Sequence, residues 1–446
     1  MRSDLTQGPI RKKILLFAVP LLLSSLIQQL YNTVDLIFVG NFIGKSASSA
    51  IGVSSLLVTC LVGFFSGMSV GSSVVVSHLY GSKDKGKLYQ TVHTAVALSF
   101  VGGILLMLLG YFLAPHYLKL INTPVTLQAD AVSYLRIYFV SLISVMTYNI
   151  GSGVLRALGD SYTPLYAQIV GGIMNVLANT LFIVVFDFGI TGAAWATMIS
   201  QSFAAAIVLY KLTKLDSAYA LRLPKIKINW EILKRIIQIG IPAGMQSLVI
   251  TFSNVMAQFQ INSLGENQIA AFTAYFKVEL IIYLPIVAIG QAAMTFVGQN
   301  IGAKNYERVH TGTRQILIMG MILIVPLSLG ALAMGPILFR VFTNDVSVID
   351  LGLQIIQVTF PFYFIYPILQ VLGDSLRGMG KVHQPMLIVL INICIIRTIL
   401  LFIIVPRYPD IRGVAVTYPI TWGLTSVCMV AYYLYHKKRS SINLAK

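Results

Sequence analysis

The chain has 446 residues, of which 57% are hydrophobic and only 11% are charged, and its mean hydropathy is +0.80. This composition excludes a water-soluble domain and is typical of a protein that crosses a lipid bilayer many times. A net charge of +17 would suggest nucleic-acid binding in a soluble protein, but here the basic residues lie between apolar segments. We therefore expect a chain embedded in the lipid bilayer with no nucleic-acid partner.

The apolar segments, taken in chain order, define the predicted helices. A helix needs about 20 apolar residues to cross the bilayer. By that measure twelve crossings lie near residues 14-42, 48-80, 90-120, 128-155, 162-187, 190-213, 232-263, 268-300, 310-340, 348-376, 383-406 and 412-435. The sequence thus predicts an all-α polytopic membrane protein with twelve transmembrane helices.

Basic residues mark one side of the membrane. When Arg11, Lys12 and Lys13 are placed inside, most of the 32 Lys and Arg residues fall on the same side. Cytoplasmic segments of membrane proteins carry an excess of these two residues. We therefore expect a multi-pass protein of the cell (inner) membrane with both termini in the cytoplasm.

The two halves of the chain repeat each other. Six pairs of identical residues are 221 positions apart: Gly81 and Gly302, Lys83 and Lys304, Arg156 and Arg377, Gly159 and Gly380, Pro164 and Pro385, Gly192 and Gly413. Pro20 and Asn32 match Pro242 and Asn254 at an offset of 222, so we expect one residue to be lost in the loop that follows. Because each half has an even number of helices, the halves share one orientation in the membrane.

This repeat predicts the domain organisation. We expect an N-terminal lobe at 1-213 with helices 1–6, a basic cytoplasmic linker at 214-235, and a C-terminal lobe at 236-446 with helices 7–12. Two parallel six-helix bundles joined in this way are the layout of a transporter that works by alternating access.

Asp35 stands alone inside the first apolar segment, with no basic residue near it in sequence. A carboxylate in the bilayer interior costs about 2.5–3.5 kcal/mol, so such residues usually face a protein interior or a wet cavity and often carry ions or protons. Gln28, Tyr31, Asn32 and Asp35 have the spacing of one helix face. We expect Asp35 to couple transport to an ion or to bind substrate; the alternative is a buried Asp that neighbouring hydroxyls and amides satisfy permanently.

Further polar residues interrupt the other apolar segments. Asn175 and Asn179 share a face of the fifth helix, and Thr197 lies on the sixth. Their oxygens suit a hard cation or a protonated carboxyl, although hydrogen bonding between packed helices would explain them equally well. Tyr138 and Asn149 on the fourth helix are further candidates for lining a substrate cavity.

Lys277 and Glu279 bring charge into the eighth helix. Residues two apart on a helix do not face each other, so each needs another partner or a cavity. We expect both to line a cavity of the C-terminal lobe; the alternative is structural pairing, with Arg397 as a possible partner of Glu279.

Motifs of enzymes are not found in the sequence. There is no His-Glu-x-x-His helix, no nucleophile elbow and no phosphate-binding Gly-x-x-x-x-Gly-Lys-[Ser/Thr] loop. Cys60, Cys394 and Cys428 all lie in apolar segments and suggest neither a disulfide nor a metal site. We expect a transporter without enzymatic activity or cofactor, driven by a proton or sodium gradient.

Several sequence elements resemble the multidrug and toxic compound extrusion (MATE) family over nearly the full chain. They are Pro20 with Gln28 and Gln29, YNTVDLIFVG at 31–40, RALGD at 156–160 and VGQNIGAK at 297–304. The resemblance implies a V-shaped pair of six-helix bundles that exports amphipathic, often cationic, small organic compounds in exchange for protons or sodium ions. We expect a monomer.

The DinF-like branch of that family is the most similar, because the acidic residue lies in the first helix and not in the seventh. In that branch the ion site maps onto Asp35, Asn175, Asn179 and Thr197, which makes them a possible sodium site. An acidic residue often stands where this chain has Asn179, and its loss favours a proton on Asp35. A lipid-linked oligosaccharide flippase of the same superfamily is the alternative function.

The expected mechanism follows from the chemistry of a buried carboxyl, which holds its proton more readily than one in water. Protonation of Asp35 from outside would discharge it and release a bound cation, so proton and substrate would exclude each other. Pro20 and the Gly171-Gly172 pair are the expected points of bending.

Overall fold

The computed structural model describes residues 4–444, except for the side chains at positions 32, 45–48, 53, 56 and 439–444. Within that part of the chain every regular element is a helix, and twelve helical segments are long and apolar enough to cross a membrane. The predicted all-α architecture with twelve crossings is therefore confirmed.

The first half contains six long helical segments followed by a linker. Two of them, α1 and α5, continue into a π-helical turn, and the linker carries one short 3₁₀ turn. The elements are α1 (Ile10–Phe38), η1 (Val39–Ile43), α2 (Lys45–Gly81), α3 (Lys85–Leu120), α4 (Val125–Ala157), α5 (Tyr162–Asn179), η2 (Thr180–Val185), α6 (Gly189–Thr213) and η3 (Leu223–Lys225).

The second half has the same order but more interruptions. Pro361 and Pro367 lie at the breaks of the tenth crossing, where a residue without a backbone N–H cannot continue the helical ladder. The elements are α7 (Trp230–Asn262), α8 (Glu266–Gly302), α9 (Tyr306–Ala333), α10 (Gly335–Arg340), α11 (Val346–Thr359), η4 (Phe360–Ile365), α12 (Tyr366–Gly378), α13 (His383–Val389), η5 (Leu390–Ile396), α14 (Arg397–Arg407), α15 (Ile411–Ala415) and α16 (Thr417–Leu444).

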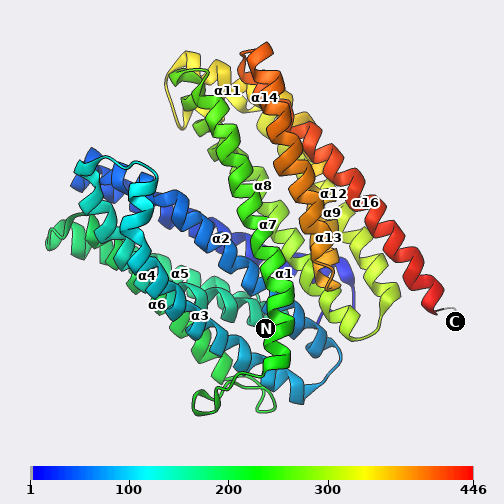
Figure 1. Cartoon of the computed structure of the whole chain (residues 1–446). Coiled ribbons are helices and arrows are strands. Elements are labelled where there is room, and N and C mark those ends of the chain that lie inside the picture. The colour runs from blue at the N-terminus through cyan, green and yellow to red at the C-terminus, as the bar shows by residue number, and fades with distance from the viewer. Residues whose placement is uncertain (1–3, 445–446) are drawn as a thin grey trace. The chain divides into compact units, whose positions relative to one another are not determined.

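The helices pack into two compact units. Unit 1 contains residues 19–244, and unit 2 contains residues 5–18 together with the chain from Met245 onward. Figure 1 shows α2 to α6 gathered in one group and α8 to α16 in the other. These units differ from the predicted lobes at two places, because α1 and α7 each begin in one unit and continue in the other.

Hydrogen bonds explain why residues 5–18 pack with the second half. The backbone N–H of Leu5 donates to Oε1 of Gln299 at 2.9 Å, and the guanidinium of Arg308 donates to the carbonyls of Leu5 and of Gly8, the latter at 2.7 Å. These bonds satisfy backbone groups that precede the first turn of α1 and that would otherwise remain unpaired.

The repeat is visible in the backbone. α2 and α8 have 37 residues each, and Gly44 and Gly265, which precede them, have φ angles of 109° and 119°, a region that favours glycine. The change of offset from 222 to 221 falls between Asn32 and Gly44, where only the first half has the π-helical turn η1. A π-helical turn accommodates one inserted residue. The extra residue therefore lies within a helix and not in the predicted loop.

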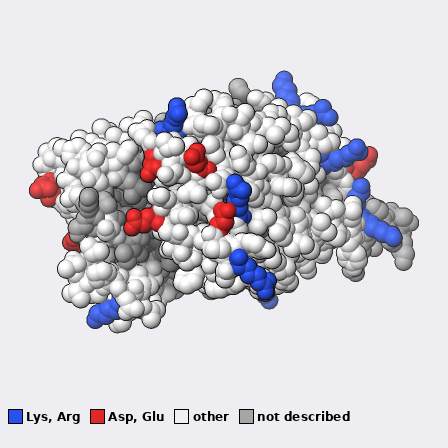
Figure 2. Space-filling view, turned by 90° about the horizontal axis from the view of Figure 1, so that it is seen from above, with Lys and Arg blue, Asp and Glu red and all other residues white. Residues whose placement is uncertain are grey.

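Small residues let the helices of each unit approach closely. In unit 1 the backbone of Gly153 on α4 lies against the hydroxyls of Ser69 and Ser73 on α2, and Ser69 donates to the carbonyl of Asn149 at 2.7 Å. Such contacts hold membrane helices together by packing and hydrogen bonding. Charged side chains are few on the face drawn in Figure 2, where most of the surface is neither acidic nor basic.

Candidate functional site

Asp35 lies in the last turn of α1 and faces α5. Nδ2 of Asn175 donates to Oδ1 of Asp35 at 3.0 Å, and Nδ2 of Asn179 donates to the same oxygen. Asn179 also donates to Oδ1 of Asn175 at 3.2 Å, and both asparagines are fully buried. The structure thus brings together three of the four residues predicted for ion coupling, all within unit 1.

The carboxylate of Asp35 has neutral partners. Among the described side chains the two ion pairs are Lys85 with Asp216 and Arg377 with Asp374, and neither involves Asp35. Its electrostatic neighbours include the phenols of Tyr134 and Tyr138 on α4. A partly buried carboxylate in an apolar helix without a cationic partner is unfavourable, so this position suits a proton or a mobile cation.

Both helices that carry this cluster change their winding directly after it. The π-helical turn η1 begins four residues after Asp35, and η2 begins immediately after Asn179. Turns of this kind are frequent at functional sites, because they shift the face that the following residues present. Asp35 and Asn179 therefore lie at the ends of regular helical segments, where the backbone departs from the α-helical ladder.

Two predicted residues bind their own helix instead. The hydroxyl of Thr197 donates to the carbonyl of Ala193 at 3.1 Å, and Nδ2 of Asn149 donates to the carbonyl of Val145 at 2.8 Å. A polar side chain in an apolar helix often satisfies itself on the carbonyl four residues earlier. Neither side chain forms a hydrogen bond with Asp35 among the described contacts.

The predicted polar stripe of α1 divides into different environments. Tyr31 is buried, and its hydroxyl accepts a hydrogen bond from Nε2 of Gln201 on α6 at 2.9 Å, whereas Gln28 is exposed. The side chain of Asn32 lies outside the described residues. Tyr138 is buried and stacks on Tyr134 with ring centroids 6.1 Å apart.

The helices that carry the Asp35 cluster also form an open apolar groove, although Asp35, Asn175 and Asn179 do not line it. It has a volume of about 250 Å³ and lies between α1 and α5. Its lining comes from the neighbours of the polar residues on both helices: Ile27, Leu30, Tyr31, Val34, Ile169, Gly172, Ile173 and Val176. A carboxylate beside an apolar groove suits an amphipathic cation.

Unit 2 holds a second carboxylate at Glu279 on α8. The hydroxyls of Tyr363 and Tyr275 donate to Oε1 of Glu279 at 2.6 and 3.1 Å. Lys277 is exposed, and the two residues form no ion pair among the described side chains. Trp422 lies against the ring of Tyr363, with centroids 4.9 Å apart, so the carboxylate is set in an aromatic cluster.

Arg397 does not form the ion pair with Glu279 that the sequence suggested. Its Nε and Nη2 atoms donate to the hydroxyl of Thr421 at 3.2 and 3.0 Å, and its guanidinium lies 4.5 Å from the ring centroid of Tyr418. Arg397 still acts electrostatically on Glu279. The buried guanidinium is thus held by a hydroxyl and an aromatic face.

Sequence reasoning missed the neutral partners of these groups. Gln201 and Tyr363 carry hydrogen bonds to Tyr31 and Glu279, yet neither was selected. Gln201 was detectable as an amide inside an apolar helix. Tyr363 gave no such signal, because tyrosine is common in membrane helices.

The Asp35 cluster fits a sodium ion poorly in its present arrangement. Sodium needs several oxygen ligands, and both amides turn nitrogen atoms toward Asp35. Oδ1 of Asn179 is buried without a hydrogen-bond partner. Within the described residues no group of three or more His, Cys, Asp or Glu side chains is arranged to hold a metal ion.

Comparison with protein families gives one matching model. The MatE family model matches residues 20–181 and 242–403. The two matched segments begin 222 positions apart, at Pro20 and Pro242, which is the offset found for the first helices of the repeat.

Similar proteins include multidrug resistance and multidrug export proteins of bacteria. YpnP of Bacillus subtilis, a probable multidrug resistance protein, is 31% identical over 88% of each chain. NorM of Thermotoga maritima, also a probable multidrug resistance protein, is 26% identical over 90% of this chain and 86% of that one. The multidrug export protein MepA of Staphylococcus aureus is 23% identical over 79% and 78%.

Solved structures share the fold at lower identity. A MATE structure in the straight conformation aligns with a TM-score of 0.91 at 20% identity and covers 98% of this chain and 99% of that one. A MATE structure in the bent conformation gives a TM-score of 0.91 at 20% identity and covers both chains completely.

Proposed function

Because this chain belongs to the MATE family of multi-pass membrane transporters, we propose that it exports amphipathic, cationic organic compounds in exchange for protons. The similar proteins with multidrug names support the substrate class. In this proposal a monomer in the inner membrane, with both termini in the cytoplasm, works by alternating access.

One observation carries the choice of the coupling residue. Asp35 is a membrane-embedded carboxylate that receives hydrogen bonds from two buried amides and has no basic partner among the described residues. The two amides stabilise its charged form, while the apolar surroundings favour its neutral form. A group balanced in this way responds to the solvent on whichever side the cavity opens.

Asn179 can serve both forms of the carboxyl. With Asp35 ionised, Nδ2 of Asn179 donates to it, and Oδ1 of Asn179 remains without a partner. With Asp35 protonated, rotation of the amide by 180° presents Oδ1 to the new O–H donor and satisfies the unpaired oxygen. An aspartate at this position could not donate in its ionised form, so Asn179 suits proton exchange.

Substrate and proton compete in this scheme for the same charge. A bound organic cation neutralises Asp35 while its apolar part occupies the groove between α1 and α5. Protonation removes the charge that holds the cation, and the cation leaves. In unit 2 the aromatic rings around Glu279 offer a second place for a cation through cation–π contacts.

The test is ethidium efflux from right-side-out vesicles loaded with the dye, with the proton gradient and the sodium gradient collapsed separately. We expect wild-type efflux to stop when the proton gradient is collapsed and to continue without sodium. Asp35→Asn is expected to remove gradient-driven efflux while the protein remains folded and inserted. Glu279→Gln is expected to retain efflux with weakened substrate binding.

Two results would contradict this proposal. Normal efflux by Asp35→Asn would exclude it as the coupling residue, and dependence on sodium alone would replace the proton by sodium at this site. Asn149→Leu is the control for a polar intramembrane position without a role in coupling, because the side chain of Asn149 binds its own helix. Transfer of a lipid-linked oligosaccharide without any effect of either gradient would favour the flippase alternative.

A further inference from the structure

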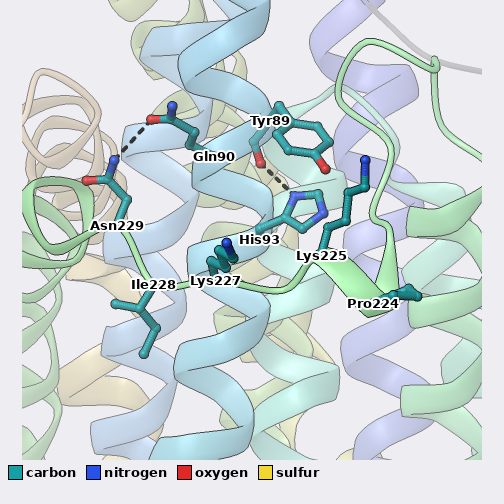
Figure 3. A pocket seen from close by; sticks show the side chains of 8 residues that line it. All are labelled: Tyr89, Gln90, His93, Pro224, Lys225, Lys227, Ile228 and Asn229. Atoms are coloured by element: carbon teal, nitrogen blue, oxygen red, sulfur yellow. Dashed lines mark hydrogen bonds between the residues drawn. The ribbon is translucent and has the colours of Figure 1, made fainter.

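A cavity of about 660 Å³ lies in unit 1 between the beginning of α3 and the linker that follows α6. Figure 3 shows its eight lining residues: Tyr89, Gln90, His93, Pro224, Lys225, Lys227, Ile228 and Asn229. None of them is acidic, and two are lysines. The cavity is distant in sequence from the Asp35 cluster and plays no part in the transport mechanism proposed above.

The linker is fastened to α3 along both sides of this cavity. The backbone N–H of Arg222 donates to Nε2 of His93 at 3.0 Å, and that of Asn229 donates to the hydroxyl of Thr94 at 3.1 Å. Nδ2 of Asn229 donates to Oε1 of Gln90 at 3.1 Å. These bonds fix the path of residues 223–228 over α3, so the fold itself defines the shape of the cavity.

His93 is a structural part of the wall. Its Nδ1 lies 2.8 Å from the carbonyl of Tyr89, which can only accept, and its Nε2 faces the N–H of Arg222, which can only donate. The ring must therefore be the neutral tautomer with its proton on Nδ1. Its ring centroid lies 4.0 Å from that of Tyr89, which gives the cavity an aromatic floor.

The charge of the cavity comes from Lys225 and Lys227. Both side chains are exposed, and neither forms an ion pair among the described residues. The nearby Asp216 is 3.9 Å from Lys85 and is not part of the lining. In Figure 3 the Lys225 side chain extends beside the Tyr89 ring. Two free ammonium groups with amide donors at the rim favour an anion and disfavour a cationic drug.

The position of the cavity indicates which class of anion it binds. The apolar crossing formed by α3 begins at Lys85, so Tyr89 and His93 lie in its first turns, at the end where an apolar helix approaches the lipid headgroups. Lysines at this level attract acidic lipids with about 1 kcal/mol each. We propose that this cavity binds the phosphate headgroup of an anionic phospholipid, with Lys225 and Lys227 as the phosphate ligands.

The experiment is native mass spectrometry of the purified full chain in detergent, titrated with phosphatidylglycerol and, separately, with phosphatidylcholine of the same acyl chains. We expect the first phosphatidylglycerol to bind more tightly than phosphatidylcholine. The double variant Lys225→Gln, Lys227→Gln is expected to weaken the first binding event on the order of tenfold or more. The matched control is Lys214→Gln, Lys234→Gln, which removes the same charge from exposed positions outside the cavity and is expected to change affinity less than about twofold.

A competition arm distinguishes the possible sources of the phosphate. If millimolar glycerol 3-phosphate does not displace phosphatidylglycerol, the result supports a lipid as the ligand. If glycerol 3-phosphate binds by itself, and the Lys225→Gln, Lys227→Gln variant loses this binding, the ligand is a soluble phosphate compound and the lipid proposal is overturned. Equal weakening in both double variants, or equal binding of the two lipids, would overturn the proposal. Ethidium efflux is measured in parallel, and loss of lipid binding with retained efflux keeps this test separate from that of Asp35.

Discussion

The two units place a carboxylate inside the membrane with different partners. In unit 1 the buried amides of Asn175 and Asn179 donate to Asp35, and in unit 2 the hydroxyls of Tyr275 and Tyr363 donate to Glu279. The two acids do not occupy equivalent positions of the repeat, because Asp35 corresponds to Ala257. The repeat therefore supplies the scaffold, and each unit has acquired its own polar group.

The amides beside Asp35 and the phenols beside Glu279 differ in the interactions that they offer. An amide carries its donor and its acceptor on separate atoms, whereas a phenol combines both in one hydroxyl and adds an aromatic face for cations. Under the proposed function, proton and substrate exchange at Asp35 in unit 1, and the aromatic cluster of unit 2 offers a second contact for the substrate. The following predictions test that difference, beginning with one that concerns the stability of the two units.

The largest expected effect concerns Arg377 of unit 2. Its Nη1 atom lies 2.6 Å from Oδ1 of Asp374, whose side chain is only 4% exposed. Arg377→Met leaves that buried carboxylate with Gln370 as a neutral donor but without a cationic partner, and we expect a loss of about 3–5 kcal/mol in the free energy of unfolding. The measurement is unfolding in sodium dodecyl sulfate followed by circular dichroism.

Unit 1 provides the matched control for this substitution. Arg156 is the repeat counterpart of Arg377, but Gly153 stands where Asp374 stands in unit 2. Arg156 forms no ion pair among the described residues, so Arg156→Met is expected to destabilise the protein less. The double variant Asp374→Leu, Arg377→Met is expected to recover most of the loss. Equal losses in Arg156→Met and Arg377→Met would show that the units do not differ in this respect.

The next effect concerns the amide donors of unit 1. Asn179→Leu removes one hydrogen bond to the charged form of Asp35, which is worth about 1.5–3 kcal/mol. The charged form is then less favourable, so the proton is released at higher pH, and we expect the midpoint of the pH profile of ethidium efflux to rise by about one to two pH units. An unchanged or lowered midpoint would contradict the role given to Asn179.

A smaller effect is expected at Glu279. Tyr363→Phe removes the donor at 2.6 Å, and we expect substrate binding to weaken by about tenfold, because a hydrogen bond to a charged group is lost. Tyr275→Phe, which removes the longer bond of 3.1 Å, is expected to have less effect. Binding is measured with ethidium fluorescence in detergent. If Tyr363→Phe has the same effect in the Glu279→Gln background, the tyrosine does not act through the carboxylate.

The smallest expected effect is at Thr197. Its hydroxyl donates to Ala193 within its own helix, so Thr197→Val is expected to change proton-driven efflux less than twofold. The rate is measured in vesicles with and without sodium. A large loss that appears only in sodium would show that Thr197 ligates the ion and that the coupling site is a sodium site.

The sequence predicted the architecture well, because twelve apolar segments and recurring Gly, Pro and Arg anchors are properties of composition and order. It also selected Asp35, Asn175 and Asn179, which the structure brings together. It could not predict the bonding of Thr197, since a hydroxyl reaches the carbonyl of its own helix as readily as a neighbouring side chain.

Other features left little or no trace in the sequence. The π-helical turn η1 results from one additional residue, which changes no composition and appears only as a shift of the repeat offset. The pairing of residues 5–18 with unit 2 depends on bonds between Leu5 and residues near Gln299, and nothing local to either segment indicates it.

The pairing of residues 5–18 with unit 2 affects the order in which segments of the chain can dock during synthesis. Leu5 and Gln299 are 294 positions apart, so the ribosome needs roughly 15–60 s at 5–20 residues per second before the partner of Leu5 exists. Until then Leu5 lacks this partner, although the rest of α1 can already pack against α5 and α6. A segment that is translated early is thus docked late, and unit 2 is assembled from parts of the message that lie far apart.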